Sequence, residues 1–306
     1  MNLNQKSEIK ELVKQNIEKY GSASKVATLC GVSDAAISQI IAGKYQTQGD
    51  DMWNKIAIAL NYQFKDSKWN IANTIAKMQL ESAFNTAKSQ SIFIGVASKA
   101  GSGKTAVSRE FYNNSGLNEH VYMIECGEWS GRRFLMVFAR IISAEIKTTG
   151  YGYVQNSDII YAIKNTLKPL AANKPLIIID QANSLKASAL RTLVHIYNQL
   201  EDVIGLVLLG TENLEFEIKK GVRLNKVGYD ELDSRFGRKY IQLTGCTLSD
   251  CANICKANNI NNNDKISNIF KECKPVRRRI ADKDIEVVED FRVLKRHIIV
   301  ERELNL

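Results

Sequence analysis

The sequence predicts an α/β fold in which helices cover both faces of a parallel sheet, with a helical unit before the sheet and another after it. Continuous apolar runs such as Leu176 to Ile179 and Ile204 to Asn213 alternate with helical segments, which is typical of a buried parallel sheet. A glycine-rich turn joins an apolar run to a helix near residue 100. Apolar residues recur at helical spacing near the N-terminus. A chain of 306 residues is long enough for about two domains.

The composition is that of an ordinary globular protein, with 44% hydrophobic and 25% charged residues. The formal net charge of +9 favours a polyanionic partner. No apolar run approaches the length of a membrane span, and the charged N-terminus lacks an apolar signal core, so we expect a cytoplasmic protein. The six cysteines form no C-x-x-C pair. Cys251 and Cys255 lie one helical turn apart, but reduced thiols are expected rather than a metal site.

Residues 1–65 form the first predicted unit, and its central part has the plan of a helix-turn-helix. A short helix over Ser24 to Leu29 precedes a glycine-containing turn and a second helix, Asp34 to Ile41, with Ser33 as the N-cap. This arrangement resembles the repressor-type helix-turn-helix family and implies DNA contact, although a helical bundle that binds protein is the alternative. The small basic excess of the unit predicts low sequence specificity. The expected DNA-contacting residues are Ser33, Asp34, Ala36, Ser38, Gln39 and Lys44.

Residues 66–90 are expected to form a linker helix into the second domain. The segment is amphipathic, with apolar residues such as Ile75 and Phe84 on related faces. We expect its flexible part near Lys65 to Lys68.

The stretch Ile92 to Thr105, IFIGVASKAGSGKT, predicts a phosphate-binding loop between a strand and a helix. Gly101 and Gly103 let successive backbone N–H groups turn inward around an anion, and the helix N-terminus adds partial positive charge. Lys104 would contact the β- and γ-phosphates of ATP. The consensus motif begins with glycine, where this chain has Ser98. The expected nucleotide-binding residues of the loop are Ser98, Lys99, Ala100, Gly101, Ser102, Gly103, Lys104, Thr105 and Ala106.

Polar residues follow two further apolar strands, at the carboxyl edge of the sheet where ligands bind. Asp180 ends the strand Leu176 to Ile179, and Thr211 ends the strand that begins at Ile204. We expect the Asp180 carboxylate and the Thr105 hydroxyl to hold Mg²⁺.

One strand, Val121 to Glu125, intervenes between the loop and Asp180, and this order resembles that of the additional-strand NTPases, including the AAA+ ATPases. The resemblance implies an ATPase core over residues 91–245, in which Thr211 is a first sensor that orients the attacked water or the γ-phosphate. The stretch LDSRFGRKY resembles the segment that carries the arginine finger of this family. Arg235, or alternatively Arg238, would then reach the γ-phosphate of a neighbouring subunit.

Residues 246–306 have the size of the helical lid that follows an AAA+ core. The family carries a second sensor arginine at the start of the third lid helix, which implies Arg279 or Arg278; otherwise this basic cluster is a solvated or DNA-facing surface. The expected lid helices are Ser249 to Lys256, Lys265 to Cys273, Arg277 to Ile280 and Val287 to Leu294.

The whole order of units resembles the family of the phage Mu B transposition protein, with local similarity in SGKTAVSREFYNN, LIIIDQANSL, IGLVLLGTEN and CKPVRRRI. The resemblance implies ATP-dependent, largely sequence-independent binding of double-stranded DNA, assembly into helical homo-oligomeric filaments and recruitment of a transposase. The chain departs from the family at Gln181, where a glutamate usually polarises the attacking water. Glutamine accepts no proton, so slow hydrolysis is expected unless Glu212 or Glu125 partly substitutes.

Two other functions fit the sequence. An ATP-regulated transcription factor would use the helix-turn-helix to read an operator, and would protect a defined palindrome on DNA. A helicase-loader-like ATPase would share the same core.

Overall fold

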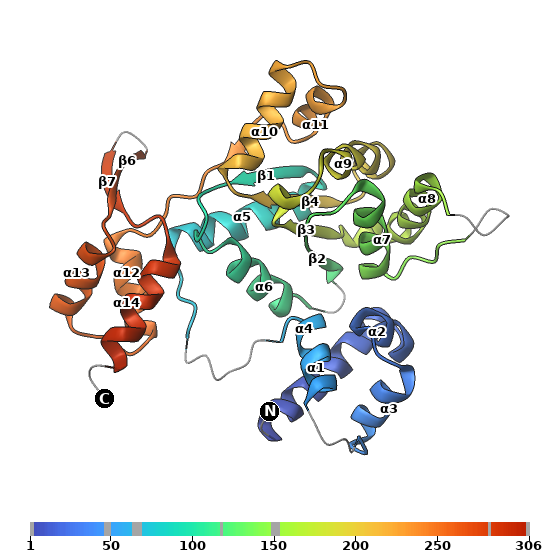
Figure 1. Cartoon of the computed structure of the whole chain (residues 1–306), viewed down its shortest axis with the longest axis horizontal. Helices are drawn as coiled ribbons and strands as arrows, with labels where there is room; N and C mark the ends of the chain where they lie inside the picture. The colour runs from blue at the N-terminus through green and yellow to red at the C-terminus, as the bar shows by residue number, and fades with distance from the viewer. Residues whose placement is uncertain are drawn as a thin grey trace.

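The computed structural model describes residues 3–45, 50–62, 69–116, 119–147, 154–280 and 283–303. Figure 1 shows a central α/β body with the N-terminal helices on one side and the C-terminal helices on another. The predicted flexible stretch at Lys65 to Lys68 lies outside the described residues.

The described part of the N-terminal unit contains four helices, α1 (Leu3–Tyr20), α2 (Ala23–Cys30), α3 (Asp34–Ala42) and α4 (Asp51–Ala59). Ser33 caps α3 by accepting the Ala36 backbone N–H at 3.2 Å, an interaction worth about 1 kcal/mol. Gly31 ends α2 at φ 65°, a conformation that glycine adopts without strain. The resulting turn sets α2 and α3 at an angle of 113°. α2 and α3 are therefore two short helices joined by a tight glycine-containing turn.

The sheet of the central body consists of five parallel strands in the order β2-β3-β4-β1-β5. Alternate residues face opposite sides, so that Ile177 and Ile179 pack into one core cluster while Leu176 and Ile178 pack into the other. β4 lies between β1 and β3, which separates the loop strand from the strand that ends in Asp180. The strands are β1 (Phe93–Ala97), β2 (Val121–Glu125), β3 (Leu176–Asp180), β4 (Gly205–Gly210) and β5 (Tyr240–Ile241).

Helices cover both faces of this sheet, as the continuous apolar strands predict. One face is covered by α5 (Ile75–Gln90) and α6 (Lys104–Asn114). The other side carries α7 (Gly131–Ile141), α8 (Asn156–Leu167), the short helix η2 (Lys168–Asn173), η3 (Ala182–Ser184), α9 (Ala187–Leu200), α10 (Glu212–Arg223) and α11 (Tyr229–Arg235).

The helix predicted over residues 66–90 is present but begins later than expected. Residues 69–74 are not helical, and α5 begins at Ile75 after the N-cap Thr74. A Cβ placed on Gly205 of β4 would lie 2.3 Å from the carbonyl oxygen of Ala87. The helix therefore packs directly on the sheet and belongs to the central body.

Among the described residues, the C-terminal unit contains three helices and a hairpin, where only helices were predicted. Residues 277–280, expected to be helical, lie in β6 (Val276–Ile280), which pairs antiparallel with β7 (Lys283–Val287). The helix expected over 287–294 is present but starts later, because Val287 ends β7 and the helix begins at Phe291. The helices are α12 (Leu248–Ala257), α13 (Asn263–Glu272) and α14 (Phe291–Glu303).

The N-terminal unit contacts the central body through the end of α1. The Tyr20 hydroxyl lies 3.1 Å from the Tyr112 hydroxyl, and Lys19 Nζ lies 3.9 Å from the centre of the Tyr112 ring. Tyr112 belongs to α6, the helix that follows the glycine-rich loop. No single helix of the described segments is long and apolar enough to cross a membrane, although the bent pair α2 and α3 passes that test of length and composition together.

Candidate nucleotide-binding site

The glycine-rich loop connects β1 to α6 and has the backbone expected of an anion cradle. Gly101 and Gly103 have φ values of 79° and 86°, in the region that favours glycine. The backbone N–H of Ser98 donates to Gly210 O at 3.2 Å, which ties the start of the loop to the neighbouring strand β4. Ser98 is buried, so the serine in place of the consensus glycine is accommodated without a change of fold.

Lys104 is held inside this loop. Its ammonium donates to Ser98 O at 2.8 Å, to Lys99 O at 2.9 Å and to Ser102 Oγ at 2.9 Å. Burial lowers the pKa of Lys104 to about 8, a shift that the Asp180 carboxylate opposes. Oxygen acceptors thus fix a cation at the point where a polyphosphate would meet the loop.

Thr105 and Asp180 meet across the end of the sheet. Thr105 Oγ1 donates to Asp180 Oδ2 at 2.5 Å, and the Gln181 backbone N–H donates to Asp180 Oδ1 at 2.8 Å. Burial raises the pKa of Asp180, while these two hydrogen bonds favour its charged form. Hydroxyl and carboxylate oxygens suit Mg²⁺, which takes one or two protein ligands and completes its shell with phosphate and water. The described residues contain no cluster of three or more His, Cys, Asp or Glu side chains able to hold a metal.

Gln181 and Thr211 lie at the same edge of the sheet, after β3 and β4. Gln181 is exposed and has a left-handed φ of 56°. The backbone N–H of Thr211 donates to Asn183 Oδ1 at 3.2 Å, which joins the ends of the two strands. Asn183 was not singled out from the sequence, where only its place three residues after Asp180 could have indicated this role.

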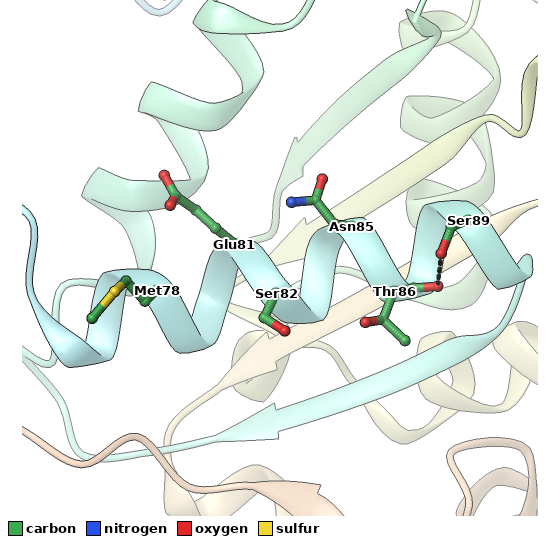
Figure 2. A pocket seen from close by; sticks show the side chains of 6 residues that line it. All are labelled: Met78, Glu81, Ser82, Asn85, Thr86 and Ser89. Carbon is green, nitrogen blue, oxygen red and sulfur yellow. Dashed lines mark hydrogen bonds between the residues drawn. The ribbon is translucent and has the colours of Figure 1, made fainter.

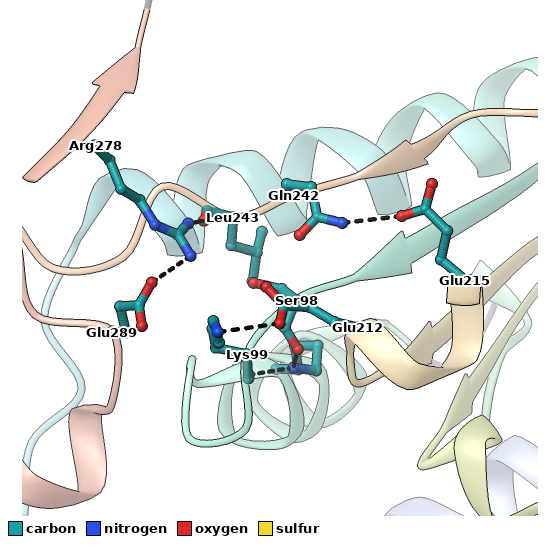
Figure 3. A network of polar contacts seen from close by, with 9 residues as sticks. Ser98, Lys99, Glu212, Glu215, Gln242, Leu243, Arg278 and Glu289 are labelled. Carbon is teal, nitrogen blue, oxygen red and sulfur yellow. Dashed lines mark hydrogen bonds and ion pairs between the residues drawn. The ribbon is translucent and has the colours of Figure 1, made fainter. Parts of the chain in front are cut away.

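Both carboxylates that could replace a catalytic glutamate are held in ion pairs. Lys99 Nζ lies 3.2 Å from Glu212 Oε2, a pair close to Ser98 in Figure 3. Arg109 makes a two-pronged contact with Glu125, at 2.6 Å and 2.7 Å. Glu125 also ends the edge strand β2. Each carboxylate would therefore have to leave its ion pair before it could accept a proton from water.

Arg235 packs within its own subunit. Its guanidinium lies 4.6 Å from the centre of the Tyr197 ring, and Nη2 donates to Asn198 Oδ1 at 3.1 Å. Both partners belong to α9, so these contacts do not bring Arg235 to the phosphate loop of the same chain. The alternate residue, Arg238, donates to Asp230 Oδ1 at 2.7 Å.

Arg278 and Arg279 were predicted as second-sensor residues because a helix was expected to start there. No helix starts at either residue, so this expectation is wrong. Both lie on β6. Arg278 contacts the carboxylate of Glu289 and donates to Leu243 O at 3.2 Å, as Figure 3 shows. The third lid helix begins at Phe291, whose backbone N–H donates to Gly101 O at 2.9 Å.

The arginine at the start of that helix is Arg292, which sequence reasoning missed because it placed the helix elsewhere. Arg292 lies near enough to lower the pKa of Lys104 further. Arg292 is thus the arginine at the start of the third helix of the C-terminal unit, which is the position that the AAA+ resemblance had implied for Arg279.

The residues predicted to contact DNA lie mainly on the exposed side of α3. Ser33, Asp34, Ser38, Gln39 and Lys44 are exposed. Ala36 is buried at 6% exposure, so its prediction as a DNA-facing residue is wrong. Its neighbour Ala35 is the exposed small residue at this position.

A shallow depression elsewhere on the molecule is separate from the loop. Figure 2 shows that its side chains all project from α5, and it contains no residue of the glycine-rich loop. Its lining residues are Met78, Glu81, Ser82, Asn85, Thr86 and Ser89.

Part of the chain matches a known protein family. The family model of the AAA domain matches residues 88–216, and with the parallel sheet and its loop this confirms the predicted AAA+ P-loop NTPase fold. No match to an individual curated protein was found.

Two solved structures are similar at low identity. Cdc6p from Pyrobaculum aerophilum is 15% identical with a TM-score of 0.42, over 60% of this chain and 48% of its own. The Drosophila ORC bound to AT-rich DNA and Cdc6 is 11% identical with a TM-score of 0.33, over 74% of this chain and 93% of its own. The chain thus spans about half the length of the Pyrobaculum protein.

Proposed function

We propose that the chain, whose residues 88–216 match the AAA domain, binds ATP with Mg²⁺ and in that state binds double-stranded DNA. The observation that carries the proposal is the contact of Thr105 with the buried Asp180 beside the ammonium of Lys104. These are the groups that nucleotide triphosphatases use to hold Mg²⁺ and the terminal phosphates.

Each group has a distinct role in this proposal. Lys104 neutralises charge on the β- and γ-phosphates, and Thr105 with Asp180 holds the metal, which supplies charge neutralisation for the departing phosphate. Thr211 and Gln181 orient water at the carboxyl edge of the sheet. Gln181 accepts no proton, and Glu212 and Glu125 are engaged in ion pairs, so hydrolysis is slow.

The site is completed by a second copy of the chain. Arg235 is the arginine finger in this proposal, supplied in trans, with Arg238 as the alternate. The contacts of Arg235 with its own α9, rather than with its own loop, support a role outside its own subunit.

DNA contact is assigned to the exposed side of α3, through Ser33, Asp34, Ser38, Gln39 and Lys44. The proposed units are residues 1–65 for DNA contact, 91–245 for the ATPase core and 246–306 for the lid. The similarity of four stretches to the phage Mu B family supports a more specific role, in which ATP-bound filaments capture target DNA with little sequence preference and recruit a transposase. The net charge of +9 agrees with a polyanionic partner.

Duplex binding of the wild type and Lys104→Ala, with and without ATP and Mg²⁺, tests this function. ATP should strengthen binding of the wild type to random-sequence duplex and have no effect on the variant, because alanine supplies no cation to the β- and γ-phosphates. Lys168→Ala, a change at an exposed lysine of η2, serves as the control and should behave as wild type. Undiminished ATP affinity in Lys104→Ala would refute the nucleotide site. Tight, salt-insensitive binding to one short palindrome would favour the transcription factor instead.

A further inference from the structure

The β6–β7 hairpin is an exposed basic ribbon that the nucleotide site does not use. Figure 1 shows it standing out from the C-terminal helices. Because side chains alternate along a strand, Arg277 and Arg279 share one face of β6 while Arg278 points to the other. The Arg277 side chain is 84% exposed. Arg279, and Lys274 and Lys283 at the two ends of the ribbon, are also exposed.

The acidic residue opposite Arg277 holds this arginine only weakly. Arg277 pairs in register with Glu286, but Arg277 Nε and Glu286 Oε1 are 3.8 Å apart and both side chains are exposed. Exposed pairs of this kind contribute about 0–1 kcal/mol, since water screens them. A phosphate, which accepts two hydrogen bonds from a guanidinium, would replace Glu286 as the partner of Arg277.

The opposite side of the ribbon is fixed to the nucleotide-binding body. Arg278 contacts Leu243 O, next to β5, and the carboxylate of Glu289, which follows β7. The next residue, Asp290, lies against Gly101 so closely that an added Cβ there would meet Asp290 Oδ1 at 1.9 Å. The Phe291 backbone N–H then donates to Gly101 O at 2.9 Å. A short continuous path thus runs from the ribbon to the phosphate loop.

We propose that the outer face of this hairpin, the face of Arg277 and Arg279, is a second contact for the sugar–phosphate backbone of duplex DNA, and that nucleotide bound at the loop controls its position. The proposal rests on the ATP-dependent DNA binding argued above. A two-stranded ribbon has the dimensions of a DNA groove, and arginine forks match phosphate oxygens. Backbone contacts carry no sequence information, which agrees with binding to random duplex.

The test compares two double variants that remove the same charge from the C-terminal unit. Arg277→Ala with Arg279→Ala removes both arginines of the proposed face, whereas Lys256→Ala with Lys271→Ala changes exposed lysines of α12 and α13. In the presence of ATP the ribbon variant should bind random duplex more weakly. Its slope of log affinity against log salt should also become shallower, by about 0.9 for each phosphate that the variant no longer neutralises. The α12–α13 variant should keep the wild-type slope. Glu286→Gln, which removes the competing carboxylate, should strengthen binding.

The control of the hairpin by bound nucleotide is tested by measuring DNA affinity with and without ATP. The ribbon variant should lose more affinity with ATP than without it; an equal loss in both states would overturn the link to the loop. Unchanged affinity and salt slope in the ribbon variant, with the wild type still bound in an ATP-dependent manner, would refute the hairpin contact alone and direct attention to an acidic protein partner. Absence of ATP-dependent DNA binding in the wild type would instead refute the underlying function. Circular dichroism of each variant establishes that it is folded.

Discussion

Lys104 is a buried cation whose charge depends on pH close to neutrality. Burial lowers the pKa of its ammonium to about 8, so the folded protein loses this proton as the pH rises above that value. In the unfolded chain the pKa of a lysine is about 10.4, so the unfolded state binds more protons than the folded state between about pH 8 and that value. The contribution of Lys104 to the free energy of unfolding therefore rises with pH over this interval.

Nucleotide binding should show the opposite trend, because phosphate needs the protonated form. We expect ATP affinity to fall about tenfold from pH 7 to pH 9, in proportion to the protonated fraction of Lys104. Lys104→Arg keeps its charge over this range and should give a flat profile, whatever its absolute affinity. Equilibrium binding of a fluorescent ATP analogue across this range measures both. A wild-type profile as flat as that of the arginine variant would contradict the assignment of this pKa to the binding step.

Gln181 follows Asp180, the proposed Mg²⁺ ligand, at the position where the AAA+ resemblance places the catalytic glutamate. Gln181→Glu should raise steady-state ATP turnover by about 10²-fold or more, because general-base catalysis typically contributes 10²–10⁴-fold. DNA-bound assemblies of this variant should also dissociate sooner.

Two further variants test whether Glu212 or Glu125 acts as the general base in place of Gln181. Glu212→Gln and Glu125→Gln remove groups that already pair with Lys99 and Arg109, and should leave wild-type turnover nearly unchanged. Fast wild-type turnover that disappears in either variant would show that Gln181 does not limit the reaction.

At the scale of elements, the sheet and its loop were predictable from local pattern. Strands buried on both faces appear as unbroken apolar runs, and the loop motif predicts that a helix follows the glycines; in the structure this helix begins at Lys104. The contact between Thr105 and Asp180 also follows from the rule that the carboxyl ends of parallel strands meet at one edge.

The lid was less predictable because its hairpin is determined by pairing across strands. The run Val276 to Ile280 contains three arginines, which are good helix formers, so local propensity favoured a helix. Pairing with Lys283 to Val287 sets Arg277 opposite Glu286 and Arg279 opposite Asp284, and this cross-strand match overrides propensity. Arg292 was missed as a direct result.

The contact between α14 and the phosphate loop can be tested by its effect on thermal stability. Gly101→Ala adds a Cβ at φ 79° that would lie 1.9 Å from Asp290 Oδ1, so the start of α14 should be displaced and thermal stability should fall. Gly103→Ala has the same backbone strain at φ 86° but meets nothing within 4 Å, and should lower the melting temperature less. Adding Asp290→Ala to Gly101→Ala should restore part of the stability. Equal melting temperatures for the two alanine variants would argue against this packing.

At the scale of the whole molecule, assembly depends on which subunit Arg235 serves. Arg235→Ala should leave ATP binding by the monomer nearly intact, because its observed contacts are with α9 rather than the loop. ATP-dependent assembly and turnover should fall. Sedimentation velocity with ATP, together with a turnover assay, measures both effects.

Asn198→Ala distinguishes a role in trans from a structural one. This change removes the acceptor that holds Arg235 to its own subunit. If Arg235 acts on a neighbour, assembly should be retained or strengthened in Asn198→Ala. Loss of assembly in both variants would mean that Arg235 only stabilises α11 against α9, and Arg238→Ala would then be the next variant to measure.

The segments that contact β1 and the phosphate loop come late in the sequence, which affects folding during synthesis. β1 pairs with β4 and β5, and Gly101 is bonded by Phe291 near the end of the sequence. Contacts of such long sequence separation form slowly, and during synthesis they must wait for the later segment to emerge from the ribosome. The phosphate loop therefore acquires its final shape only after residue 291 has been synthesised, and a chain that has not reached this residue lacks the completed loop on which the proposed nucleotide site depends.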